Sequence, residues 1–229
     1  MRKVLLVLVA AGLLLAAVAS AQVAVPAEFP RRDAAEILDS DLVELVALDP
    51  TIHLDIRYAT PNNLAGRPVY PEARALLQRP AAEALVRVNA ALRKQGFGLL
   101  VYDGYRPWSV TKIFWDVTPP DKREFVADPT KGSKHNRGCA VDLSLYDLAT
   151  GREAEMPSVY DEMSPRAYPT YTGGTDQQRI ARDRLKAAME TEGFTVEPNE
   201  WWHFNYREWA RYPILNIQFS EIVPRAAPR

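Results

Sequence analysis

The chain has 229 residues, with 28 basic and 29 acidic side chains, three histidines and one cysteine. Its balanced charge gives no electrostatic case for a nucleic-acid partner, and a single cysteine excludes an internal disulfide. The length fits one domain with a sizeable hydrophobic core.

The first residues are typical of an export signal. Arg2 and Lys3 precede an almost wholly apolar run over residues 4–18, and a small-x-small cleavage site ends at Ala21. The run is short for a bilayer span, and no basic stop-transfer cluster follows it. We therefore expect residues 1–21 to be removed. The mature protein is then exported to the periplasm or cell envelope of a bacterium, without integral membrane association.

The next segment predicts an arm followed by a strand. Residues 22–50 contain Pro26, Pro30 and a mixed polar and apolar pattern, which indicates an extended arm with a short helix near 33–38. Alternating apolar and polar residues over 52–58 predict a half-buried strand, which a Pro-Asn-Asn turn ends. His53 lies on the polar face of this strand, and we interpret it as a structural residue.

The middle of the chain predicts a helix, a strand and a second helix. Residues 81–95 carry apolar side chains at helical spacing, and Gly96 is a natural C-cap. A short apolar strand over 98–102 ends in the turn 103–107. Residues 108–117 are expected to be helical, before a charged, proline-rich loop.

The last third predicts a strand, a long helix and a hairpin. The strand covers residues 139–145, and a helix over 176–192 buries Ile180, Leu185 and Met189 on one side. Residues 194–196 and 201–206 form the hairpin. Without regular βαβ alternation, the pattern favours an α+β fold with a small antiparallel sheet flanked by helices. We expect a single domain over residues 51–229.

Two of the three histidines lie in segments that also contain carboxylates. Strand parity puts Asp142 between the small residues Ala140 and Ser144, opposite a core face formed by residues 141, 143 and 145. His135 precedes Gly138, which allows the chain to turn back toward Asp142. With His203, these side chains offer three ligands for Zn²⁺ and leave a fourth position open for water.

Three further residues near these segments need an assignment. Cys139 has the opposite strand parity to Asp142, so we interpret it as a small buried residue and not a ligand. Strand parity in the last hairpin puts Trp201, His203 and Asn205 on one face. Glu200 has the wrong parity for this face, so we place it beside the metal, where a general base is needed. Arg106 is either a surface charge or a fixed cation for an oxyanion, and beside a metal motif we favour the second role.

These segments resemble the D-Ala-D-Ala dipeptidases associated with vancomycin resistance, a zinc-peptidase group related in fold to lysostaphin and the amino-terminal hedgehog domain. The resemblance includes Ser-x-His-x-x-Gly-x-Ala-x-Asp over residues 133–142 and Glu-Trp-Trp-His over 200–203. Further similar segments are residues 55–60 with Asn63 and Gly66, the turn 103–107, residues 160–163 and the helix 179–193. The resemblance extends from about residue 55 to residue 206.

The resemblance implies a role for each site residue. One zinc ion per chain is held by His135, Asp142 and His203; Glu200 is the catalytic acid and base, and Arg106 stabilises the transition state. Asp161 meets the free amino group of the substrate. The residues expected to help hold a small dipeptide are Ser133, Tyr58 and Tyr70. Trp201 and Trp202 are expected to wall the site with one of them in the core, and we assign Trp201 to the substrate.

We therefore expect a zinc-dependent dipeptidase that hydrolyses D-alanyl-D-alanine in cell-wall peptide metabolism, by Glu200-assisted attack of zinc-bound water. The partner is a small D-amino-acid dipeptide, and the sequence indicates no oligomeric state. One alternative is a D,D-carboxypeptidase or endopeptidase acting on longer peptidoglycan peptides, which the export signal keeps open. The other is a non-catalytic, zinc-stabilised wall-binding domain, against which the presence of both Glu200 and Arg106 speaks.

Overall fold

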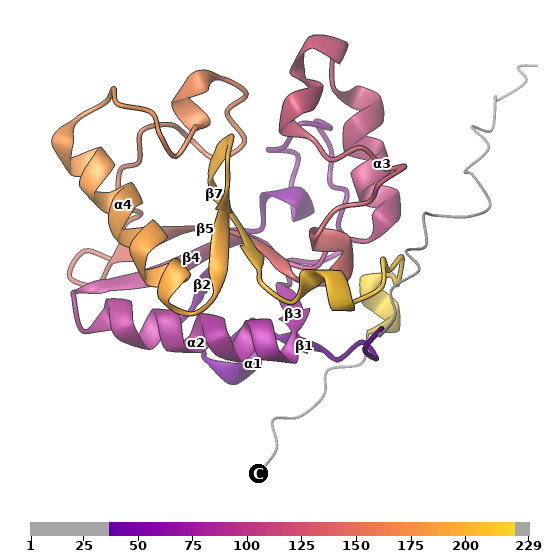
Figure 1. Cartoon of the computed structure of the whole chain (residues 1–229), viewed down its shortest axis with the longest axis horizontal. Helices are drawn as coiled ribbons and strands as arrows, with labels where there is room; N and C mark the ends of the chain where they lie inside the picture. Colours follow the sequence, from indigo (N-terminus) through magenta and orange to yellow (C-terminus); the bar gives the residue numbers. More distant parts are fainter. Residues whose placement is uncertain (1–36, 223–229) are drawn as a thin grey trace, which may run out of the picture.

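The computed structural model describes residues 37–222 (Figure 1). The predicted export signal, and most of the short helix predicted near residues 33–38, lie outside this range. No helix in the described part of the chain is long and apolar enough to span a membrane.

A five-stranded sheet carries the candidate site, and its strand order is β2-β4-β5-β7-β6. The strands are β2 (His53–Leu54), β4 (Phe97–Asp103), β5 (Ala140–Asp147), β6 (Phe194–Glu197) and β7 (Glu200–Tyr206). Only the short edge strand β2 pairs in parallel, and the other neighbours are antiparallel. The α+β class and the antiparallel sheet are therefore confirmed.

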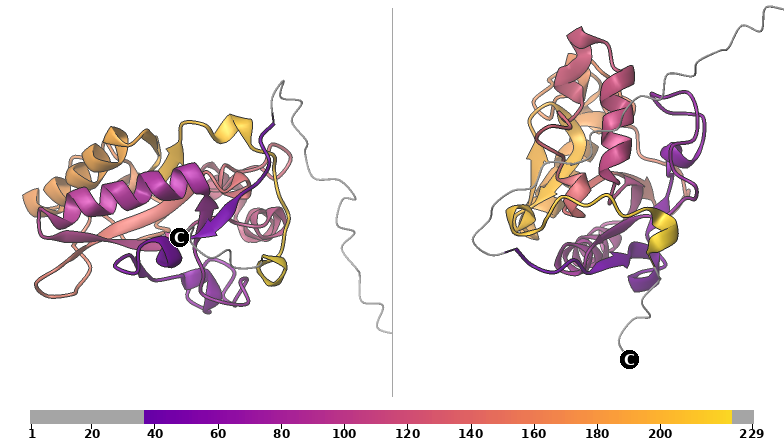
Figure 2. Two further views of the ribbon diagram at one scale, coloured as in Figure 1. Left: turned by 90° about the horizontal axis from the view of Figure 1, so that it is seen from below. Right: turned by 90° about the vertical axis from the view of Figure 1, so that its right-hand side faces the viewer.

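The helices follow the predicted ranges closely. They are α2 (Arg79–Arg93), α3 (Trp108–Val117) and α4 (Asp176–Thr191). Helix α2 packs on β4 and α4 on β6, and the two helices contact each other beside the sheet (Figure 2). Thr175 begins α4 with a capping box closed by Gln178, which satisfies the first backbone N–H groups of the helix.

One residue of the predicted apolar side of α4 is misplaced. Ile180 is 58% exposed, whereas Leu185 and Met189 are fully buried. Ile180 precedes these residues by five and nine positions, which in a helix of 3.6 residues per turn puts it about 140° and 180° away from them. It therefore lies on the face opposite the core, and the helical spacing itself was misread.

Two predictions near the amino terminus are also corrected. The strand expected over residues 52–58 is confined to β2, and a 3-10 turn, η1 (Arg57–Ala59), follows it. The guanidinium of Arg57 pairs with Asp55 at 2.9 Å where the chain leaves the sheet. The end of the predicted arm forms β1 (Leu42–Glu44) and α1 (Leu45–Leu48), and β1 pairs with β3 (Leu76–Gln78).

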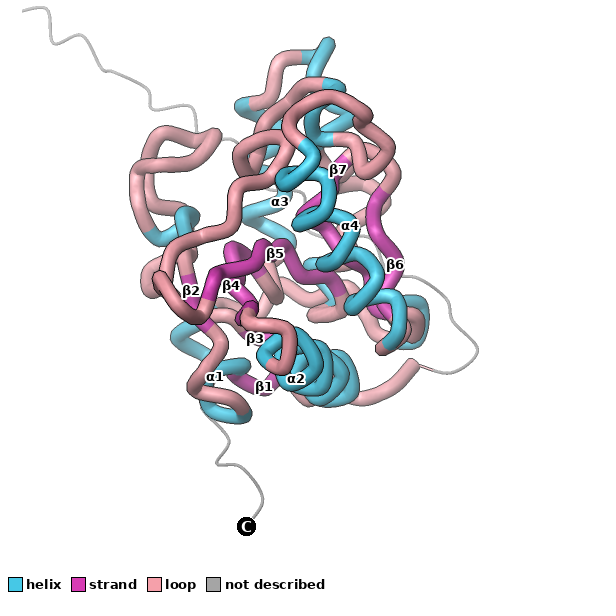
Figure 3. Tube along the Cα trace, turned by 90° about the vertical axis from the view of Figure 1, so that its left-hand side faces the viewer, coloured by secondary structure: helices cyan, strands magenta, loops and turns pink. Residues whose placement is uncertain are grey.

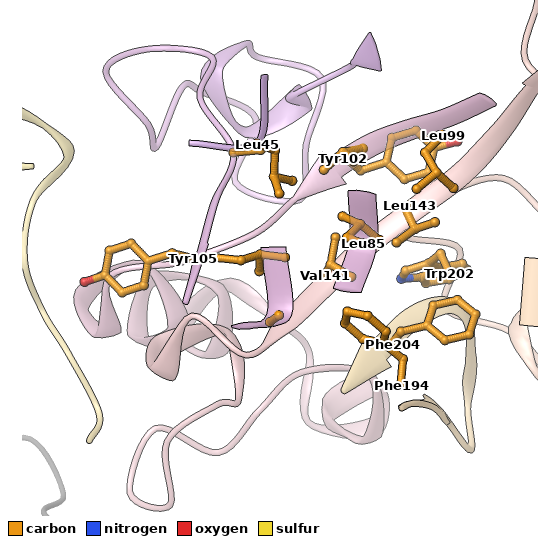
Figure 4. Packing of buried hydrophobic residues seen from close by; sticks show 14 of the residues in the cluster. Leu45, Leu85, Leu99, Tyr102, Tyr105, Val141, Leu143, Phe194, Trp202 and Phe204 are labelled. Atoms are coloured by element: carbon orange, nitrogen blue, oxygen red, sulfur yellow. The ribbon is translucent and has the colours of Figure 1, made fainter. Parts of the chain in front are cut away.

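The core lies between the sheet and helix α2. Val141 and Leu143 of β5 pack near Leu85 of α2 and Phe204 of β7, all fully buried (Figure 4). Each such side chain contributes roughly 1.5–3 kcal/mol through its burial. The predicted core face of β5 is confirmed, and Cys139 is buried as expected. Loops gather on the side of β4 and β5 away from α2 (Figure 3). Asp142 lines a cavity together with residues of these loops.

Candidate metal centre and active site

Three buried side chains from separate elements converge on the loop-covered side of the sheet. Asp142 of β5 pairs directly with His203 of β7 in the antiparallel register. His135 begins the 3-10 turn η3 (His135–Arg137), which ends at Gly138 with a left-handed φ of 66°. The predicted sharp turn at this glycine is therefore present, and it brings His135 back beside Asp142.

The ligand atoms of these three residues form a compact triangle. His135 Nε2 and His203 Nδ1 are 3.1 Å apart, and Asp142 Oδ1 lies 3.3 Å from the first and 3.0 Å from the second. Ligands bound at about 2.0–2.1 Å in a tetrahedral site are about 3.3 Å from each other. Asp142 Oδ1 is buried and forms no hydrogen bond within the described residues. The three atoms therefore fit a divalent metal ion.

Hydrogen bonds on the far side of each ring fix which nitrogen faces the triangle. The Nδ1–H of His135 donates to Gly104 O at 2.7 Å, and the Nε2–H of His203 donates to Asn205 Oδ1 at 2.8 Å. Both acceptors are oxygens, so the nitrogens that face Asp142 are unprotonated when the rings are neutral. A Cβ at residue 104 would lie 2.6 Å from Leu76 O, so this close approach requires glycine.

The amide of Asn205 is itself held in place. Its Nδ2 donates to Glu197 Oε2 at 2.7 Å, and Lys134 Nζ lies 3.2 Å from the same oxygen. This arrangement directs the amide oxygen toward His203. The sequence motif ends at His203, but strand parity puts Asn205 on the same face and was the available signal for it.

The electrostatics of the triangle favour an anion at Asp142. Burial alone would raise the pKa of this carboxyl, but contact with His135 and His203 holds it well below its usual range. Burial alone would lower the pKa of His203, but the contact with Asp142 raises it to about 9. Metal ligation requires a neutral imidazole, so metal binding near neutral pH releases a proton from this cluster.

Glu200 lies at the edge of the triangle without belonging to it. It opens β7 after a two-residue turn, and the pairing of β6 with β7 shifts register between Val196 and Glu197. The shift brings Glu200 Oε2 to 3.5 Å from His203 Nδ1. Burial raises the pKa of Glu200 to about 8. Such a carboxyl can take up and return a proton near neutral pH.

A cavity of about 330 Å³ opens beside the triangle. The predicted site residues that line it are Tyr58, Arg106, Ser133, His135, Asp142, Asp161, Glu200 and His203. Sequence analysis did not assign Glu197, Phe114 or Lys134, which also line it.

Two predicted substrate contacts are not brought to this cavity. Tyr70 is buried, and its hydroxyl donates to Asp103 Oδ1 at 2.7 Å. Trp201 is 1% exposed and donates from Nε1 to Ser158 Oγ at 2.9 Å, whereas Trp202 lines the cavity. The parity argument assumed a regular strand, and the register shift between β6 and β7 breaks that regularity. His53 also lies elsewhere, stacked on Tyr146 at 3.9 Å.

Arg106 is a fixed cation on the cavity wall. Its Nε and Nη2 donate to Asp103 Oδ2 at 2.9 and 2.8 Å, and Nη2 lies 3.6 Å from Asp142 Oδ2. The rings of Tyr58 and Phe114 each lie 5.2 Å from the guanidinium carbon. Burial would lower its pKa, but the charge of Asp103 raises it well above the usual value. The guanidinium therefore stays charged at a fixed position.

Asp161 and Ser133 complete the cavity on the loop side. Asp161 has a left-handed φ of 63°, the single non-glycine residue in the described range with a positive φ. Its Oδ1 accepts a hydrogen bond from the Tyr58 hydroxyl at 3.2 Å, and burial raises its pKa to about 7. Ser133 Oγ accepts the backbone N–H of His135 at 3.2 Å.

Comparison with known proteins gives one consistent family. Residues 39–223 match the family model described as D-Ala-D-Ala dipeptidase. The chain is 34% identical over 181 residues to a D-alanyl-D-alanine dipeptidase of Escherichia coli. The aligned region covers 79% of this chain and 92% of the relative. A D-alanyl-D-alanine dipeptidase of Enterococcus faecalis is 35% identical over 194 residues, which covers 76% of this chain and 96% of the relative.

The comparison with solved structures gives a weaker similarity. The chain is similar to the vancomycin-resistance D,D-dipeptidase VanXYg, solved in complex with a D-Ala-D-Ala phosphinate analogue. The TM-score is 0.43 and the identity 21%, over 78% of this chain and 59% of that chain.

Proposed function

Because the chain belongs to the D-Ala-D-Ala dipeptidase family of metallopeptidases, we propose that it is a zinc-dependent dipeptidase that hydrolyses D-alanyl-D-alanine to two D-alanines. The observation that carries this proposal is the buried triangle of His135, Asp142 and His203 with Glu200 at its edge. Zinc suits a set of two imidazoles and one carboxylate, which leaves a fourth position open.

The metal supplies a Lewis acid that polarises the scissile carbonyl and makes the attacking water more acidic. Glu200 takes the proton of that water and returns it to the amine of the leaving D-alanine. The raised pKa of this carboxyl, about 8, is suited to both steps. Arg106 offers its fixed charge to the carbonyl oxygen as negative charge develops there.

The loop side of the cavity supports a substrate with a free amino terminus. Asp161 offers a carboxylate to an ammonium group, and the Tyr58 hydroxyl already fixes one of its oxygens. Ser133 lines the cavity beside His135 and can donate its hydroxyl to the substrate. A buried carboxylate left without its ammonium partner is costly, which favours the free dipeptide over blocked or longer peptides.

We also propose where the protein acts and where its catalytic domain begins. The predicted signal over residues 1–21 supports export to the periplasm or cell envelope, where dipeptides are released from peptidoglycan. The pairing of β1 with β3, together with the family match from residue 39, supports a catalytic domain that starts near residue 39 and not at residue 51.

The test is alanine release by the purified mature protein, loaded with zinc. Free D-Ala-D-Ala is compared with N-acetylated D-Ala-D-Ala and with a pentapeptide stem. We expect hydrolysis of the free dipeptide alone. Cleavage of the blocked or longer peptides would reassign the protein as a D,D-carboxypeptidase, and no cleavage of any of them would favour a binding domain.

A further inference from the structure

Four oxygen atoms form a continuous chain from the amino-group side of the cavity to the metal cluster. The hydroxyl of Tyr58 lies 3.2 Å from Asp161 Oδ1 and 2.7 Å from the hydroxyl of Tyr160. The hydroxyl of Tyr160 in turn lies 3.1 Å from Asp142 Oδ2. Both tyrosines are buried, with 4% and 5% exposure, so water does not readily replace these contacts.

This chain of oxygen atoms has more contacts than protons. Each tyrosine hydroxyl donates one hydrogen bond, and an ionised carboxylate only accepts. When Asp161 and Asp142 are both ionised, two protons therefore serve three oxygen–oxygen contacts. The distance of 2.7 Å between the two hydroxyl oxygens is that of an O–H···O hydrogen bond, and it is shorter than the contacts of 3.2 and 3.1 Å with Asp161 and Asp142. One hydroxyl therefore donates to the other, which leaves two arrangements, each with both hydroxyls pointing the same way and one carboxylate without a donor.

These two arrangements make Asp161 and Asp142 compete for the same donors. In the first, Tyr160 donates to Tyr58, and Tyr58 donates to Asp161. In the second, Tyr58 donates to Tyr160, and Tyr160 donates to Asp142 Oδ2. A substrate ammonium brings its own donors to Asp161, so it releases the Tyr58 hydroxyl and favours the second arrangement.

Resting on the function proposed above, we propose that Tyr160 is a positioning residue that couples the amino-group site at Asp161 to the metal ligand Asp142. Occupation of the amino-group site directs the Tyr160 hydroxyl to Asp142 Oδ2, while Oδ1 of the same carboxylate faces the two histidines. A donor on the outer oxygen of a ligating carboxylate orients it toward the metal. The coupling is reciprocal, so zinc tightens the binding of the dipeptide by the same factor.

The hydroxyl of Tyr160 can be removed by substitution while the packing contacts of its ring are kept. The ring stacks on Tyr102 with centroids 4.3 Å apart and meets the edge of Trp202 at 5.6 Å. A phenylalanine at residue 160 keeps these contacts and removes only the hydroxyl. Tyr102 is a matched control, because it is buried in the same cluster and its hydroxyl donates to Glu153 instead.

The experiment measures zinc affinity by chelator competition, with and without saturating D-Ala-D-Ala, in protein carrying E200Q so that the dipeptide is turned over only slowly. We expect the dipeptide to tighten zinc binding in E200Q, and the factor of tightening to fall about tenfold in E200Q/Y160F. E200Q/Y102F should tighten zinc like E200Q. E200Q/Y58F interrupts the chain of oxygen atoms at a second point, so it should lose the dipeptide-induced tightening of zinc binding to the same extent as E200Q/Y160F. The triple variant E200Q/Y58F/Y160F should lose no more than either.

Each outcome has a distinct meaning. Equal tightening in E200Q, E200Q/Y160F and E200Q/Y102F would overturn the coupling and leave the proposed dipeptidase intact. A dipeptide that does not bind E200Q, together with wild-type protein that does not hydrolyse it, would overturn the proposed function and the coupling with it. Equal losses in Y160F and Y102F would assign the effect to general packing and so overturn the role of the Tyr160 hydroxyl.

Discussion

The metal triangle and the amino-group side of the cavity are built by different kinds of structure. Two of the three residues of the metal triangle, Asp142 and His203, face each other across two hydrogen-bonded strands, so the backbone ladder sets their separation, and the third, His135, lies on the 3-10 turn η3 beside them. Tyr58 and Asp161 lie on a 3-10 turn and a loop, and side-chain hydrogen bonds hold them in place. We call the metal triangle with Glu200 the strand-borne side, and Tyr58 with Asp161 the loop-borne side. We infer that the strand-borne side determines the reaction and that the loop-borne side determines the choice of substrate.

A substitution on the strand-borne side should have the largest effect on activity. E200Q keeps the size of the side chain but cannot accept a proton, so we expect kcat for D-Ala-D-Ala to fall roughly a thousandfold. Zinc content, measured by metal analysis, should be unchanged because Glu200 is not one of the three converging ligands.

A carboxylate of the same hairpin provides the control for E200Q. Glu197 lines the same cavity but lies on the other side of the His203 ring, 3.8 Å from Nε2. E197Q should therefore lose far less activity than E200Q. Equal losses would mean that total negative charge, and not proton transfer at Glu200, sets the rate.

Changes on the loop-borne side should alter substrate choice more than rate. D161N removes the charge that meets the ammonium, so we expect KM for D-Ala-D-Ala to rise roughly 10- to 100-fold, which corresponds to about 1.5–3 kcal/mol for a charged hydrogen bond. Asparagine tolerates the left-handed φ of 63° at this position. Steady-state kinetics of D161N and of the neighbouring variant E162Q measure the effect. A rise in KM in E162Q as large as that in D161N would contradict the assignment.

The same contrast explains what the sequence could and could not predict. Two-residue periodicity placed Asp142 on the face opposite the core residues of its strand, because regular strands alternate faces. It could not show that β5 pairs with β7, which brings His203 opposite Asp142. It misplaced Trp201, since a register shift between β6 and β7 cannot be read from alternation. On the loop-borne side no periodicity exists. The placement of Tyr58 and Asp161 rested on resemblance alone, and Tyr70 is buried on Asp103 instead.

A smaller effect is expected from loss of the hydrogen bond that orients the metal ligand His203. N205A removes the oxygen that accepts the Nε2–H of His203, so the ring loses its preferred tautomer and orientation. We expect zinc affinity to fall about tenfold in chelator competition. N199A is the control, because Asn199 also lines the cavity but its amide donates to Glu124 O. Unchanged affinity in N205A would show that the strand pairing alone positions His203.

The last expected effect concerns the stability of the folded protein and its dependence on pH. Burial raises the pKa of Asp161 to about 7 in the folded protein, above the ordinary value of 3.8 that holds after unfolding. The folded state therefore binds this proton more tightly. The stabilisation is fully present below about pH 4 and is lost as the pH rises through 7.

D161N lacks the titrating carboxyl, so its metal-free form should not share this loss. We expect the free energy of unfolding of the wild type, measured by urea denaturation of metal-free protein, to fall relative to that of D161N between pH 4 and pH 7 and then to level off. The difference is on the order of 1 kcal/mol for each pKa unit between the two states. A constant difference across this range would mean that Asp161 is already ionised in the folded protein at pH 4. Its side of the cavity would then be hydrated, and loop and strand sides would differ in solvent access as well as in structure.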